Sequence, residues 1–194
     1  MEKNGKIWTK YKNLYVIPAN INLAGVSLEL DQDIKNTGRT KAEKLKKHID
    51  KIKNDYDFIL IDCPPSLGII TTNALTASDS VIIPVQCEFF ALEGITQLLK
   101  AIMYTQANLN PNLSIEGVLL TMLDARTNLG LEVVEEIRSY FKDKVYNTII
   151  PRLIRLTEAP SHGKPIVAYD PKSRGSEAYL NLAKEVIKAN GNTN

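Results

Sequence analysis

Short apolar runs alternate with amphipathic segments of helical length along this chain, and that alternation limits its fold more than any other feature. The run at 58–62, F-I-L-I-D, shows no apolar–polar alternation, which is typical of a parallel strand covered on both faces. Strands that alternate with helices indicate βαβ units, so we expect an α/β fold in three layers, a parallel sheet flanked by helices. The predicted strands are 13–17, 58–62, 80–85, 115–121 and 144–150. The predicted helices are 39–54, 64–77, 91–107, 128–141 and 175–189. The stretch 151–174 contains four prolines and is expected to be loop-rich.

Composition narrows the class of protein. The 194 residues carry 24 Lys and Arg against 22 Asp and Glu, so the formal charge is 24 − 22 = +2 and bulk charge alone would not attract nucleic acid. With 44% hydrophobic residues, this length suits a single domain over 1–194. No apolar run approaches the roughly 18 residues that span a bilayer. Residues 1–6 lack the apolar core of a secretory signal, and the two cysteines then indicate reduced thiols in a cytoplasmic protein.

Asp62 is the first candidate for chemistry, because in parallel sheets ligands bind at the carboxyl ends of the strands. An acid after four apolar residues matches the Walker B arrangement, in which a strand-end carboxylate helps to hold Mg²⁺ on a nucleotide. Mg²⁺ retains several waters, so Asp62 could hold it through water. The alternative is that Asp62 caps the helix that follows, and the pattern alone gives the two interpretations equal weight.

A longer set of motifs closely resembles the ParA/Soj family, the P-loop ATPases of chromosome and plasmid partitioning. The motifs are F-I-L-I-D-C-P-P-S-L-G at 58–68, I-I-P-V-Q-C-E at 82–88, L-L-T-M-L-D-A-R-T-N at 119–128 and E-A-P-S at 158–161. The resemblance implies a P-loop NTPase-type fold, ATP and Mg²⁺ as cofactors, and an ATP-dependent dimer that binds DNA without sequence preference. It also implies a ParB-type centromere-binding partner and a cytoplasmic, nucleoid-associated protein. The polar C-terminal residues show no amphipathic membrane helix, so no membrane partner is expected.

The family's phosphate-binding motif is not found in these residues. No G-x-x-x-x-G-K-[ST] occurs, since Gly5-Lys6 is followed by Ile7 and Gly163-Lys164 by Pro165. The family's second strand, with its aspartate, is not found either. We therefore expect an N-terminally truncated chain that corresponds to about three quarters of the family's domain. By itself it would not hydrolyse ATP, because positioned charge provides most of the transition-state stabilisation in phosphoryl transfer.

The resemblance also assigns site residues. Pro151 and Arg152 match the loop that contributes to the adenine pocket, largely through backbone groups. Arg126 and Arg155 match arginines that contact DNA, a role suited to a planar guanidinium that stays charged and pairs with phosphate oxygens. For both arginines the alternative is a solvated loop charge.

Three functions remain open at this point. The chain is a portion of a ParA/Soj ATPase, or a non-catalytic module that binds DNA or full-length ParA, or an unrelated α/β enzyme. The third is the weakest, because the sequence contains no G-x-G-x-x-G fingerprint.

Overall fold

The computed structural model describes residues 2–3, 6–20, 22–23, 41–64, 66–88 and 91–191. They form two compact units, Met1–Ala77 and Ser78–Asn194. Each unit is described by itself.

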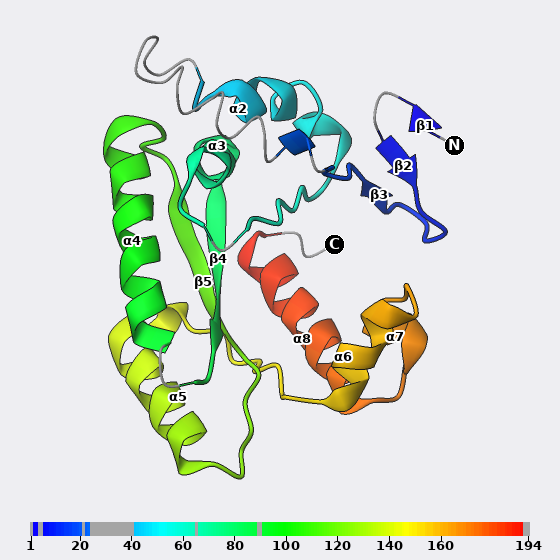
Figure 1. The fold of residues 1–194 in the computed structure, drawn as a ribbon, viewed down its shortest axis with the longest axis vertical. Helices are drawn as coiled ribbons and strands as arrows, with labels where there is room; N and C mark the ends of the chain where they lie inside the picture. Colours follow the sequence, from blue (N-terminus) through cyan, green and yellow to red (C-terminus); the bar gives the residue numbers. More distant parts are fainter. Residues whose placement is uncertain are drawn as a thin grey trace. The chain divides into compact units, whose positions relative to one another are not determined.

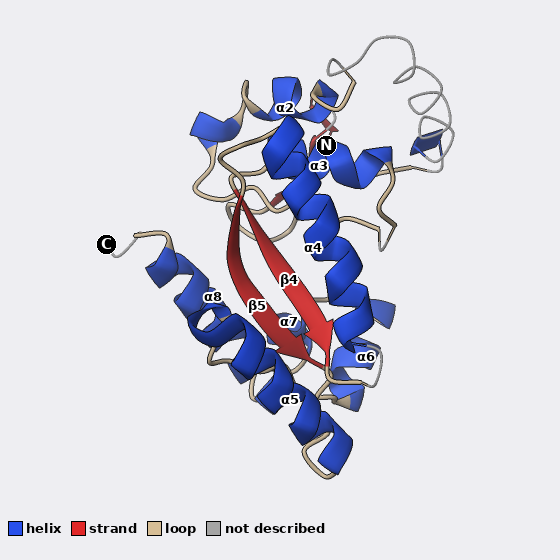
Figure 2. Ribbon diagram, turned by 90° about the vertical axis from the view of Figure 1, so that its left-hand side faces the viewer, coloured by secondary structure: helices blue, strands red, loops and turns tan. Residues whose placement is uncertain are grey.

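The second unit is built on two parallel strands, β4 (Ser80–Gln86) and β5 (Ser114–Thr121), which lie side by side in Figure 2. In their register Ile83 lies beside Val118 and Val85 beside Leu120, and all four side chains are buried. Burial of branched apolar side chains on neighbouring strands is the packing that the unalternating sequence predicts. The parallel pairing confirms the prediction for this part of the sheet.

Helices cover both faces of this pair. α4 (Ala91–Asn108) and α5 (Asn128–Phe141) lie on one side and α8 (Arg174–Ala189) on the other, as Figure 1 shows. On the α8 side, Leu119, Tyr146 and Ile150 form a buried cluster. Hydrophobic side chains of α8 and of residues 154–161 pack around that cluster, among them Leu156, Ala178, Leu182 and Val186. The arrangement is a layered α/β fold, as predicted.

The predicted strand at 144–150 is wrong. After a 3-10 turn, η3 (Lys142–Lys144), the segment makes two isolated bridges to the β5 side, Val145 with Val118 and Pro151 with Leu123. Between the bridges, the N–H groups of Asn147 and Thr148 donate to the Glu185 carboxylate of α8. Glu185 thus takes the N–H of Thr148, which stands between the two N–H groups that donate to β5, those of Tyr146 and Ile150, and the segment follows β5 without becoming a strand.

The loop expected at 151–174 contains two helices, α6 (Ile154–Ser161) and α7 (Ile166–Tyr169). Pro160 lies inside α6, one residue before its end; it has no N–H to donate to the carbonyl of Leu156 four residues earlier, and the helix ends directly afterwards. Pro165 precedes α7 directly, with φ −67°, a position that favours helix initiation.

The first unit differs more from the predictions. Its strands β1 (Glu2–Lys3), β2 (Lys6–Trp8) and β3 (Tyr15–Val16) form an antiparallel sheet in the order β1-β2-β3, so the run at 13–17 pairs with β2 and joins no parallel sheet. α2 (Lys44–Ile49), η2 (Lys53–Asp55) and α3 (Ile69–Ala77) are shorter than predicted. Residues 39, 40 and 65 of the predicted helices lie outside the described residues.

The predicted strand at 58–62 is also wrong. The described chain there is neither helix nor strand, and Leu60 is 84% exposed. The strands described in this unit pair with one another, so this run has no ladder partner among them. An apolar sequence becomes a strand only beside another strand that satisfies its backbone N–H and C=O groups.

Candidate nucleic-acid interface

Two loops of the second unit meet at the carboxyl end of β5. The N–H of Leu123 donates to the carbonyl of Ile150 at 3.3 Å, and the N–H of Arg152 donates to the carbonyl of Leu123 at 2.9 Å. Pro151 and Arg152, the two residues predicted for the adenine pocket, therefore lie directly beside the loop that carries Arg126.

Arg126 is held by a carboxylate two residues away. Its Nε donates to Asp124 Oδ1 at 2.8 Å and its Nη2 to Oδ2 at 2.6 Å, while its backbone N–H donates to Oδ1 at 3.1 Å. These hydrogen bonds, led by the one from the Arg126 side chain, lower the pKa of Asp124 to about 2, and the positive charge of Arg152 adds to the shift. The Arg126 side chain remains 88% exposed, so the paired guanidinium lies at the surface.

Arg152 forms an ion pair between Nη2 and Glu88 Oε1. Glu88 follows β4, and Arg152 follows the segment 145–151, which bridges to the other edge of β5. The ion pair therefore connects the two segments that flank the carboxyl end of β5. This contact uses the Arg152 side chain, while its backbone N–H donates to the carbonyl of Leu123 in the neighbouring loop. The predicted adenine contact, which uses backbone groups, stays a prediction.

Arg155 lies in the first turn of α6 and also has acidic neighbours. Its Nη1 is 3.1 Å from Glu158 Oε2, and its Nε is 3.7 Å from Asp170 Oδ2. The Tyr169 hydroxyl donates to Glu158 Oε2 at 3.2 Å, so this cluster connects α6 with α7. Contact with Tyr169 and the charge of Glu158 raise the pKa of the Arg155 guanidinium.

Asp62 is in a different unit from these four residues. It is exposed, in the unit Met1–Ala77, whereas Arg126, Pro151, Arg152 and Arg155 belong to Ser78–Asn194. Within the described ranges, no group of three His, Cys, Asp or Glu side chains could hold a metal ion. Mg²⁺ usually needs one or two carboxylates together with substrate phosphates. One carboxylate meets that requirement only together with a phosphate cradle, so the assignment of Asp62 to magnesium stays a prediction.

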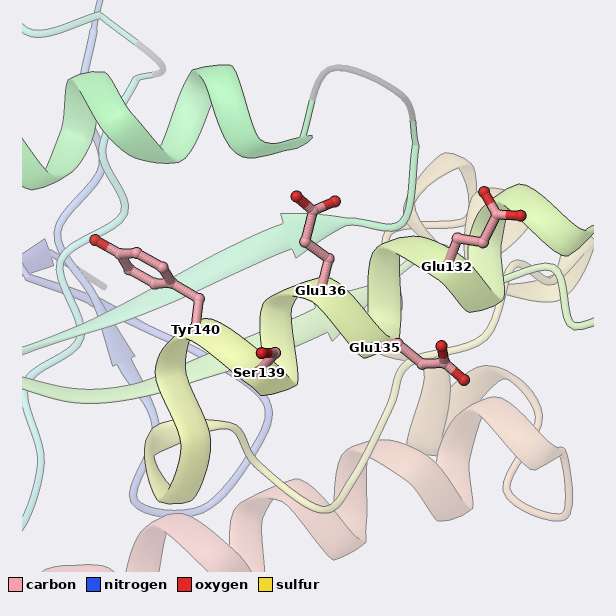
Figure 3. Close-up of a pocket in the computed structure, with 5 residues that line it drawn as sticks. All are labelled: Glu132, Glu135, Glu136, Ser139 and Tyr140. Carbon is pink, nitrogen blue, oxygen red and sulfur yellow. The ribbon is translucent and has the colours of Figure 1, made fainter.

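A depression of about 650 Å³ lies on α5 and contains none of the predicted site residues. Its lining consists of Glu132, Glu135, Glu136, Ser139 and Tyr140, all from this one helix (Figure 3). Glu135 and Glu136 point in different directions in Figure 3, so their oxygens do not converge on one point. The depression is an acidic stretch of helix surface and does not resemble a metal site.

The sequence did not reveal the partners of the arginines. Asp124 and Glu88 both stand in the motifs that suggested the family, yet neither was assigned a role. The D-A-R spacing at 124–126 was the available signal, because an Asp two residues before a donor commonly accepts from the backbone in a turn.

The parallel strands, the helices on both faces and the loops gathered at the strand ends define a P-loop NTPase-type α/β protein. Residues 2–115 match the family model described as an AAA domain. Among solved structures, the chain is similar to cobyrinic acid a,c-diamide synthase from Mycobacterium smegmatis with bound ADP and magnesium. That match has 32% identity and a TM-score of 0.77, over 98% of this chain and 68% of the other. The cell division ATPase MinD of Pyrococcus furiosus matches with 26% identity and a TM-score of 0.71, over 95% of this chain and 69% of the other.

Relatives by sequence are more specific. The sporulation initiation inhibitor protein Soj of Bacillus subtilis is 61% identical over 183 residues, which are 94% of this chain and 70% of the relative. The chromosome-partitioning ATPase Soj of Treponema pallidum is 50% identical over the same shares. The chromosome partitioning protein ParA of Caulobacter vibrioides is 49% identical over 92% of this chain and 66% of the relative. The chain belongs to the ParA/Soj family.

Among the described residues, no helix is long and apolar enough to cross a bilayer.

Proposed function

We propose that this chain acts in chromosome or plasmid partitioning, as the portion of a ParA/Soj protein that contacts DNA without sequence preference. The observation that carries the proposal is the 61% identity to Soj over 94% of the chain, together with relatives named as chromosome-partitioning proteins. The proposed partners are DNA, a ParB-type centromere-binding protein and a second copy or full-length ParA. The proposed location is the nucleoid in the cytoplasm.

The DNA contact is assigned to Arg126 and Arg155. Both guanidinium groups are accessible, with side chains 88% and 59% exposed; Arg126 lies in the loop after β5 and Arg155 in the first turn of α6. Arginine can bind two phosphate oxygens at once, and this pairing is independent of base sequence. The net charge of +2 is too small to provide the affinity for DNA by itself, so loss of the two arginines should weaken DNA binding.

A titration of a labelled duplex tests this assignment. The chain and its R126A/R155A variant are compared by fluorescence anisotropy at about 50 and about 200 mM salt. We expect weaker binding by the double variant and a smaller difference at the higher salt. Equal affinities at both salt concentrations would exclude the two arginines.

We propose that ATP binds only where the family's phosphate-binding loop completes the site, and that this polypeptide by itself does not hydrolyse ATP. Asp62 would be the magnesium carboxylate, acting through water, and Pro151 and Arg152 would contribute to the adenine pocket. The 194 residues contain no G-x-x-x-x-G-K-[ST] whose N–H groups could cradle the β- and γ-phosphates. A steady-state phosphate-release assay with Mg-ATP should show no turnover. Turnover that D62A abolishes would contradict the proposal.

The second candidate is a non-catalytic module that binds DNA or a full-length ParA. The same missing phosphate motif favours it, because a chain that holds no triphosphate could still present Arg126 and Arg155. Mixing the chain with a full-length ParA in a co-sedimentation assay separates the two candidates, since only a module would co-sediment without ATP.

A further inference from the structure

The Asp124 carboxylate occupies the part of Arg126 that would bind a phosphate. Nε and Nη2 of the guanidinium donate to the two carboxylate oxygens at 2.8 and 2.6 Å, a parallel two-bond arrangement. A phosphate group would use the same pair of donors in the same geometry. Because one pair of N–H groups cannot serve both anions, the carboxylate and a phosphate exclude each other at this edge.

The remaining N–H groups of Arg126 do not remove the conflict. A phosphate on the other edge of the guanidinium would lie close to the Asp124 carboxylate, and two like charges at short range repel. The Asp124 side chain is 26% exposed and the Arg126 side chain 88%, so the carboxylate is fixed nearer the loop while the guanidinium faces outward. The acid therefore opposes a phosphate at either edge.

We propose that Asp124 is a built-in competitor of DNA phosphate for Arg126, so that this one carboxylate lowers the DNA affinity of the chain. The inference rests on the proposed function, because it needs Arg126 to contact DNA.

Asp124 is a cleaner test than the acids beside Arg155. Glu158 accepts from both Arg155 and Tyr169, so its replacement would also disturb the packing of α6 with α7. The Asp124–Arg126 pair spans two residues of one loop. In Asp124→Asn the amide oxygen can still accept the backbone N–H of Arg126, now at 3.1 Å from Oδ1, and the turn is kept.

Asp143→Asn is the matched charge control. Asp143 lies in η3, just past the other end of the 14-residue α5, about 20 Å from the Asp124 end by helix rise alone. That separation exceeds the Debye length at about 50 mM salt, so its charge is largely screened from Arg126. Both substitutions remove one carboxylate and alter nothing else in net charge.

The test is a set of anisotropy titrations of a random-sequence duplex with wild type, D124N, D143N, R126A and D124N/R126A. At about 50 mM salt D124N should bind about two- to fivefold more tightly than wild type, the range that an exposed ion pair allows. D143N should stay close to wild type. In the R126A background the gain from D124N should fall to the level of D143N.

Two results would overturn the inference in distinguishable ways. If R126A weakens binding but D124N is no tighter than D143N, Asp124 does not compete, and the DNA contact stands without it. If wild type, D124N and R126A all fail to bind the duplex, the proposed DNA contact is itself wrong. Circular dichroism melting of each variant verifies that the fold is retained.

Discussion

Glu185 of α8 accepts a hydrogen bond from the backbone N–H of Thr148 at 2.8 Å. The same carboxylate accepts the N–H of Asn147 at 2.9 Å and the Thr148 hydroxyl. These donors stand three and four residues before Pro151, so a side chain of α8 fixes the segment that leads to the predicted adenine loop. The position of that loop depends on a contact 37 residues away in sequence.

Replacing Glu185 by Ala should destabilise the second unit by about 1–3 kcal/mol, because the partly buried N–H and hydroxyl of Thr148 and the exposed N–H of Asn147 lose their acceptor. Hydrogen exchange of the Asn147 and Thr148 amides should become faster. Lys184→Ala on the same helix serves as the control, with an expected change within about 0.5 kcal/mol. Unchanged amide protection in the Glu185 variant would show that the carboxylate does not fix the segment.

Asp124 should titrate abnormally, and Arg126 should be the reason. The pKa of Asp124 is about 2 against an ordinary value of 3.8. Because the folded-state pKa is depressed, the pair contributes stability above the unfolded value and loses it as the pH falls toward 2. Carbon NMR of the carboxyl group should show the low midpoint in wild type and a value near 3.8 in R126A. A low midpoint that persists in R126A would assign the shift to other charges.

Gly117 leaves no room for a side chain. A Cβ there would lie 2.6 Å from the Tyr146 ring, which is buried against Leu119 and Ile150 and has little freedom to move. Gly117→Ala should therefore cost about 1–3 kcal/mol of unfolding free energy in a denaturant titration. Gly94→Ala in α4 is the opposite case, because a Cβ there meets nothing within 4 Å. Its higher helix propensity should raise the unfolding free energy by about 0.5–1 kcal/mol. Equal effects of the two substitutions would argue against the close ring contact.

Two tyrosine hydroxyls should respond differently to removal. The Tyr146 hydroxyl is buried and has no hydrogen-bond partner in the described structure, and burial, with Glu116 and Glu185 nearby, raises its pKa to about 12. The Tyr169 hydroxyl donates to Glu158 at 3.2 Å. Tyr146→Phe should leave the unfolding free energy unchanged or raise it, whereas Tyr169→Phe should lower the unfolding free energy by about 0.5–1.5 kcal/mol. Thermal melting of both variants measures the difference. A large loss in Tyr146→Phe would reveal a partner for that hydroxyl, such as a bound water.

The sequence predicted best those elements whose signals are local. α5 begins and ends at the predicted residues, 128 and 141, and in the structure the Thr127 hydroxyl caps it by accepting the N–H of Gly130 at 3.3 Å. β4, β5, α4 and α8 are likewise confirmed to within a residue or so. Helical periodicity and unalternating apolar runs depend on neighbours along the chain, so one sequence is enough to find them.

The errors have non-local causes. The run at 58–62 is as apolar as β4, but a strand also needs a paired neighbour, and composition does not supply one. In the segment 144–150, the N–H groups of Asn147 and Thr148 donate to Glu185, a residue far along the chain that the local sequence does not indicate. α6 was missed because the four prolines of 151–174 were interpreted as typical of a loop, whereas Pro160 lies within the helix.

The predicted site residues fall in both units of the structure. Arg126 and Pro151 lie on adjoining loops, as a site at the strand ends requires, while Asp62 belongs to the other unit. The acidic partners of all three arginines came from the structure. Pairing between side chains depends on rotamers and loop geometry, which a motif does not contain.

Capture of Mg-ATP by the purified 194-residue polypeptide is the most direct test, because it decides between an ATPase and a DNA-contacting chain that holds no triphosphate. Isothermal titration calorimetry with Mg-ATP, in the absence of any second subunit, should give no saturable heat up to millimolar nucleotide. Saturable binding in the micromolar range, lost in D62A, would contradict the claim that the described residues build no phosphate site.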